Sequence, residues 1–162
     1  MNPFSRFVFI ACLIVMAAGT ATSQGNPVQL SLFPPVQIVP ENESVSAFRL
    51  SLIYGRNVNM TGFDWGLVTK TTGNFTGVQW SFVGMVDQNF EGWQANAVSI
   101  TNGSFKGLQM GMFYSYASHV NGLQFSLVNS AGSMKGIQIG LLNFIKEGGF
   151  LPFCVIANWG GL

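Results

Sequence analysis

Charged residues are scarce in this 162-residue chain. Asp, Glu, Lys and Arg together make up 8% of it, and the formal net charge is +1. Proteins that bind nucleic acid or an anionic membrane by electrostatics carry a cluster of basic side chains. The seven basic residues are scattered along the chain. This composition argues against both electrostatic modes of binding, and we expect no nucleic-acid partner.

Groups that carry catalysis are equally sparse. The chain has one histidine, His119, in a segment that is typical of a solvated turn, and two cysteines, Cys12 and Cys154. A metal site needs several converging ligands, and nucleophilic catalysis needs a base held against the nucleophile. Neither arrangement is visible, and the acidic residues show no repeated pairing of the kind used in glycoside hydrolysis. The sequence therefore predicts a protein that is not an enzyme, with no catalytic, metal-binding or cofactor-binding residue and no cofactor.

One long hydrophobic run is present, and it lies at the N-terminus. Arg6 precedes a 12-residue apolar run from Phe7 to Ala18, and small residues follow it. A basic start, an apolar run of this length and an A-x-A-like site are typical of a secretory signal peptide. A membrane-spanning helix needs about 20 apolar residues. We predict a signal peptide at residues 1–23, so that Cys154 is the only cysteine of the exported chain.

The rest of the sequence is dominated by a repeat. Glycines recur with spacings of 15, 15, 15, 15 and 14 residues, and a glutamine follows most of them two positions later. The glycines are Gly62, Gly77, Gly92, Gly107, Gly122 and Gly136; the glutamines are Gln79, Gln94, Gln109, Gln124 and Gln138. Arg49 and Asp64 occupy the glutamine slot in the first two repeats. These columns are the structural repeat positions of the chain.

Apolar residues alternate with small or polar ones after each glycine, as in "GLQMGMF" and "GIQIGLL". A period of two is the pattern of β-strands, and glycine at such density disfavours helix. We predict an all-β fold, with 15-residue repeats that favour a parallel β-solenoid. In a solenoid, identical residues stack about 4.8 Å apart, which explains fixed columns of glutamine and phenylalanine. The alternative is an antiparallel up-and-down β-barrel of about eight strands.

The predicted organisation has four parts. The signal peptide (1–23) is followed by an N-terminal strand or cap (24–44), in which Pro34 and Pro35 break the strand. Seven β repeats occupy 45–149, and a divergent last repeat or C-terminal cap occupies 150–162. Trp65 and Trp80 share one slot in successive repeats, and an aromatic stripe at regular spacing is more often core than binding surface.

The repeat units carry a resemblance to a known family. "GLQFSLVN" (122–129) and "GIQIGLLN" (136–143) resemble the G-L-Q-x-G-L-V-N units of a bacterial surface-repeat family found in spirochaetes and related bacteria. The segments that flank the repeats are also similar to that family. The resemblance implies an exported, envelope-associated protein with no established biochemical activity.

These expectations define a function class. We expect a protein of the bacterial cell surface or outer membrane with a structural or interaction role and no catalytic activity, acting on an unknown envelope or surface partner. The alternative is a small outer-membrane β-barrel that forms a channel or binds lipid, in which the apolar columns associate with the outer membrane.

Overall fold

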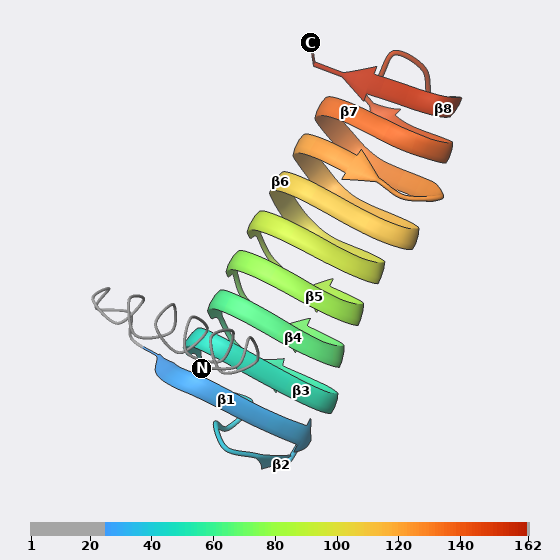
Figure 1. Cartoon of the computed structure of the whole chain (residues 1–162). Coiled ribbons are helices and arrows are strands. Elements are labelled where there is room, and N and C mark those ends of the chain that lie inside the picture. Colours follow the sequence, from blue (N-terminus) through green and yellow to red (C-terminus); the bar gives the residue numbers. More distant parts are fainter. Residues whose placement is uncertain (1–24, 162) are drawn as a thin grey trace, which may run out of the picture.

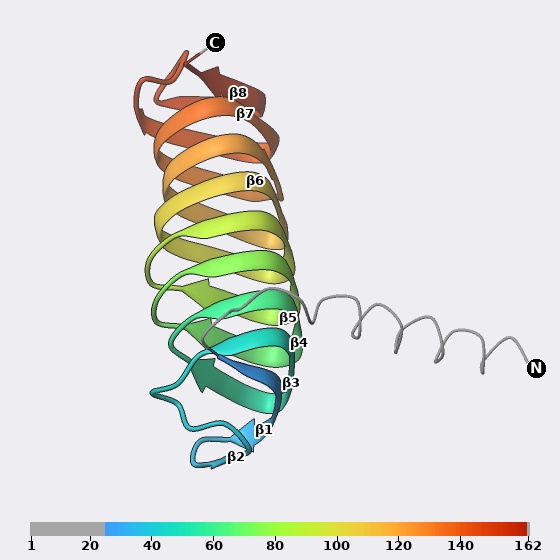
Figure 2. The same cartoon turned by 90° about the vertical axis from the view of Figure 1, so that its left-hand side faces the viewer.

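A computed structural model describes residues 25–161, and the predicted signal peptide lies outside the described residues. Within this range the chain winds into an elongated stack of coils, with β1 and β2 at one end and β7 and β8 at the other (Figure 1). All strands belong to one sheet in the order β2-β1-β3-β4-β5-β6-β7-β8. Figure 2 shows that each coil crosses the stack on two long sides.

The strand bounds follow the repeats. They are β1 (Asn26–Phe33), β2 (Val36–Gln37), β3 (Val45–Asn57), β4 (Met60–Thr71), β5 (Phe75–Val86), β6 (Phe90–Phe125), β7 (Val128–Glu147) and β8 (Phe153–Gly160). Because β6 spans 36 residues, it includes two whole repeats and the start of a third. His119 lies within this strand and is exposed, so the interpretation of its segment as a turn is wrong.

Successive repeats pair in parallel and in register. Gly62 lies opposite Gly77, Gly77 opposite Gly92, and Gly122 opposite Gly136. The parallel β-solenoid predicted from the fixed columns is therefore confirmed. The antiparallel up-and-down alternative is wrong, because neighbouring repeats run in the same direction and place like residues side by side.

The two ends of the stack are built differently. β1 pairs in parallel with β3 and places Gln29 opposite Arg49, so this N-terminal strand continues the register of the repeats. β2 then turns back on β1 as a two-residue antiparallel strand. At the other end β8 runs antiparallel to β7, with Asn158 opposite Gln138. The reversed direction of β8 covers the edge that the last parallel coil would otherwise present.

The interior has an apolar half and a polar half. The apolar half is led by a column of buried side chains that precede the repeat glycines. They are Val45, Met60, Phe75, Phe90, Phe105, Val120 and Met134. The rings of Phe75 and Phe90 stack at 4.7 Å between centroids, and those of Phe90 and Phe105 at 5.1 Å. The phenylalanines therefore stack on the residues with which their backbones pair, as expected for an in-register column.

Asparagines hold one corner of the coils. The Asn59 side-chain oxygen accepts a hydrogen bond of 2.8 Å from the backbone N–H of Asn74. The Asn74 oxygen accepts one of 3.2 Å from the backbone of Asn89, and the Asn89 oxygen one of 3.1 Å from Ser104. Each turn is therefore fixed to the coil before it by a side chain that satisfies a backbone donor.

Candidate functional site

The predicted repeat glycines occupy one column, and the structure shows why other residues do not fit there. Gly107 has φ of +129°, and the other repeat glycines have φ between +111° and +143°. A side chain on Gly107 would overlap the carbonyl oxygen of Gly92 on the preceding coil. Both the backbone conformation and the close approach of two coils therefore require glycine. These residues position the strands and are not part of a ligand site.

The glutamine column is buried and forms a continuous hydrogen-bonded ladder. Each side-chain amide donates to the side-chain oxygen one coil earlier: Gln94 to Gln79 at 2.7 Å, Gln109 to Gln94 at 2.8 Å, and Gln124 to Gln109 at 2.7 Å. Gln138 donates to Gln124 in the same way, at 2.7 Å. All five side chains are fully buried. Because every hydrogen bond between neighbouring glutamines is donated toward the N-terminal end, the ladder has one direction.

Arg49 and Asp64 explain why two repeats lack glutamine. Asp64 is an acceptor only, and it ends the ladder by accepting a 3.1 Å hydrogen bond from Gln79. Arg49 lies on the preceding coil and makes two hydrogen bonds to the same carboxylate, at 2.8 and 2.7 Å. Both side chains have no exposed area. This bidentate ion pair has no net charge, because its two buried charges compensate each other. It therefore ends the column of amides without leaving a charge unpaired.

The tryptophans lie on the outside of the coils. Trp65 is 52% exposed, Trp80 62% and Trp93 46%, so the prediction that the aromatic stripe is core is wrong. The alternation is the expected one, but in the stretch after each glycine the glutamine and the small residue point inward, and the large apolar residues point outward. Burying the amides costs little because each finds its partner one coil away.

These outward residues form a continuous surface, which we call the apolar face. It comprises three outward positions on one long side of each coil, in eight rows. The rows are Val28, Leu30 and Leu32; Phe48, Leu50 and Leu52; Phe63, Trp65 and Leu67; Val78, Trp80 and Phe82; Trp93, Ala95 and Ala97; Leu108, Met110 and Met112; Leu123, Phe125 and Leu127; Ile137, Ile139 and Leu141. None of these residues is charged or polar.

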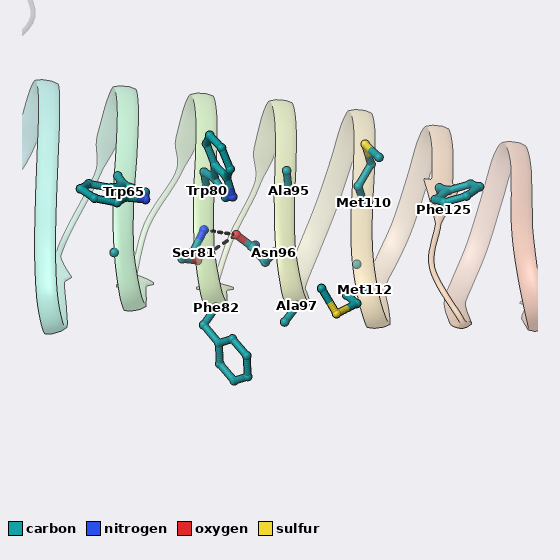
Figure 3. A pocket seen from close by; sticks show the side chains of 12 residues that line it. Trp65, Trp80, Ser81, Phe82, Ala95, Asn96, Ala97, Met110, Met112 and Phe125 are labelled. Atoms are coloured by element: carbon teal, nitrogen blue, oxygen red, sulfur yellow. Dashed lines mark hydrogen bonds between the residues drawn. The ribbon is translucent and has the colours of Figure 1, made fainter. Parts of the chain in front are cut away.

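The apolar face has a hollow of about 230 Å³ between the rows of Leu50 and Trp65, and a larger one at its fifth row. Its fifth row carries Ala95 and Ala97 where the other rows carry large side chains, and Ala97 is only 6% exposed. A groove of about 480 Å³ lies there, with Trp80 and Phe82 on one wall and methionines on the other (Figure 3). Below the floor, the Asn96 oxygen accepts hydrogen bonds from the Ser81 N–H (2.7 Å) and hydroxyl (2.8 Å). These polar groups are already paired, so the groove offers an apolar surface.

Two ion pairs lie beside the apolar face and on the second long side. Lys106 and Glu91 form an exposed ion pair of 2.7 Å just outside the apolar face. On the second side, Lys70 lies 3.1 Å from Asp87. The margin that precedes the repeat glycines thus carries charge, whereas the opposite margin continues with exposed apolar residues such as Ile53 and Phe113.

The residues that could carry other chemistry do not converge. The ring of His119 contacts the hydroxyl of Ser133 at 2.8 Å on the surface, and Cys154 is a free, half-buried cysteine in β8. Among residues 25–161 no group of three potential metal ligands lies together. The same part of the chain holds no apolar helix of membrane-spanning length.

Comparison of the chain with protein-family models, with curated proteins and with solved structures finds no match.

The apolar face was not predicted from the sequence, although two signals for it were present. The slot two positions after the glutamine column holds small residues in five repeats: Gly66, Ser81, Gly111, Ser126 and Gly140. An inward column of small residues indicates a narrow interior, which cannot accommodate the large residues between them. The two alanines in the fourth repeat, Ala95 and Ala97, were likewise the only sign of the groove.

Proposed function

We propose that this chain is an exported protein of the bacterial envelope with a structural or interaction role and no catalytic activity, and that the apolar face is its contact surface. The leader-like N-terminal sequence supports export. The observation that carries the interaction role is the uncharged apolar face itself. The largest apolar patch on a typical monomer is a few hundred Å², and larger ones mark contact with another molecule.

The size of the face supports this role. Sixteen of its residues are large and more than a third exposed, from Val28 in β1 to Leu141 in β7. A large apolar side chain that is half exposed offers roughly 80 Å², so the face presents on the order of 1,000 Å². Leaving that area in water costs free energy at about 25 cal/mol per Å². A covered face is therefore strongly favoured over a bare one.

Protection of cysteine variants tests the proposal. Leu67→Cys places a thiol on the apolar face, and Met85→Cys places one on the second side, both in a Cys154→Ser background. In envelope fragments from bacteria exporting the chain, we expect a fluorescent maleimide to label Met85→Cys and to leave Leu67→Cys largely unmodified. After unfolding in urea both thiols should react equally. Equal labelling before unfolding would show that the face is bare, which contradicts an interaction role for it.

A further inference from the structure

The groove has a ridge beside it. Trp80 and Phe82 project from β5 and are 62% and 55% exposed, among the most exposed large residues of the apolar face. On the next row their register partners are the two alanines, with Trp80 directly opposite Ala95. A ridge of two large side chains and a groove floored by two alanines therefore lie side by side, one coil apart and in the same register (Figure 3).

We propose that the partner of the apolar face is a second copy of this chain. The two copies pack face to face about a two-fold axis that runs parallel to the strands, between the Trp80 row and the Ala95 row. Such an axis places Trp80 of one copy over Ala95 of the other and Phe82 over Ala97, and the symmetry makes each contact occur twice. The inference rests on the proposed interaction role and names the partner at that same surface.

The position of this axis is supported by the rest of the face. Four rows precede the axis, in β1, β3, β4 and β5, and four rows follow it, in β6 and β7. Rotation about the axis therefore sets each of these eight rows opposite another, and it sets the short β2, with Val36 and the adjacent Ile38 exposed, opposite β8, with Trp159 exposed. The row of Trp65 meets the row of Met110, and the row of Leu50 meets the row of Phe125. All of these are apolar, as the facing layers of two packed sheets must be.

Area and charge agree with this arrangement. Each copy contributes on the order of 1,000 Å², against about 800 Å² per partner in a standard specific interface. No charge becomes buried, since the apolar face carries none. At the margin, Glu91 comes opposite Thr76 and Lys106 opposite Thr61, so no like charges meet.

An exchange of ridge and groove residues tests the axis itself. Trp80→Ala removes the ridge twice per dimer, and Ala95→Trp fills the groove twice. The double variant Trp80→Ala/Ala95→Trp restores one large and one small residue at each contact, with their positions exchanged. An equimolar mixture of the two single variants does the same in a heterodimer. Trp65 and Trp80 already lie side by side on neighbouring coils, so a tryptophan beside Trp80 is compatible with the fold.

Mass and affinity are measured by sedimentation velocity on the chain purified after export, over a range of micromolar concentrations. We expect a dimer for the wild type and for Met85→Glu on the second side. Each single variant should weaken dimerisation roughly 1,000-fold, because the two-fold axis makes the loss of the Trp80 anchor, or the clash of a new tryptophan with Trp80, occur twice. The double variant and the mixture should dimerise again. Circular dichroism and thermal unfolding check that each variant is folded.

Several results would overturn the inference. They are a wild type that stays monomeric at every concentration, a dimer that Trp80→Ala leaves intact, and single variants that neither the double variant nor the mixture rescues. A monomer that binds phosphatidylglycerol vesicles through the apolar face would identify a lipid surface instead. If the purified chain is monomeric but Leu67→Cys is protected in the envelope, the second copy is excluded and the interaction role stands. If the thiol is also accessible, both proposals fail.

Discussion

Replacement of Gln109 by leucine tests whether the buried ladder stabilises the fold. Gln109 lies in the middle of the column and takes part in three hydrogen bonds. Its amide donates to Gln94 at 2.8 Å and to the carbonyl of Tyr116 at 3.1 Å. Its oxygen accepts from Gln124 at 2.7 Å. Leucine has nearly the same size but can make none of these bonds, so the change removes the polar contacts without leaving a cavity.

The magnitude follows from what the neighbours retain. After the change, the Gln94 oxygen keeps only a 3.5 Å contact from the Thr101 hydroxyl, whereas the Gln124 amide keeps its 3.3 Å bond to the carbonyl of Ser130. A buried polar group that loses its partner costs about 1–3 kcal/mol. Burial of the apolar leucine offsets about 1–2 kcal/mol of the total. We expect Gln109→Leu to lower the free energy of unfolding by about 2 kcal/mol.

Urea unfolding followed by circular dichroism measures this difference. Asn121→Leu is the control, because it also replaces an amide by leucine but at an exposed position of the next coil. A surface change of this kind should alter stability by less than about 0.5 kcal/mol. If Gln109→Leu is as stable as the wild type, the ladder is not a source of stability, and the glutamines need another explanation.

Three further predictions concern the same interior. Gly107→Val should lower the free energy of unfolding by more than about 4 kcal/mol, because the new side chain would overlap the Gly92 carbonyl and the backbone conformation disfavours it. Lys106→Val, at the adjacent exposed position, should change it little, and thermal unfolding separates the two. Asp64→Asn should lower the free energy of unfolding by about 3–5 kcal/mol, because it leaves the Arg49 charge buried and unpaired. The double variant Arg49→Gln/Asp64→Gln extends the ladder and should stay within about 1.5 kcal/mol of the wild type. Urea unfolding measures both. Gln109→Glu should be stable in acid and lose stability as the pH rises above about 4, because burial raises the pKa of the introduced carboxyl and only its neutral form can donate to Gln94; pH-independent stability would contradict the buried ladder.

The repeat period alone was sufficient to predict the backbone path. Columns of identical residues at 15-residue spacing are explained by parallel coils in register, where each residue meets its own kind one coil away. Gly77 opposite Gly92 and Phe75 opposite Phe90 are the direct result. The proline break at Pro34 and Pro35 was also readable, since proline cannot donate to a sheet. The parallel pairing of this segment with the first repeat could not be predicted, because its spacing to that repeat differs from the period.

The choice of which side of each strand faces inward was decided by the tertiary structure. Alternation defines two faces but does not say which one is buried, and the usual expectation that apolar residues are inside misplaced Trp65 and Trp80. The coil is narrow, and its interior is lined by small residues such as Ser81 beside Gln79. Stacked glutamines fit that space and satisfy one another only when the coils are closed and in register. The hydrogen bonds that stabilise a polar interior form between coils and not within one repeat. For that reason the repeat in the sequence was enough to determine the stack, but only the closed stack determined that its apolar face is exposed.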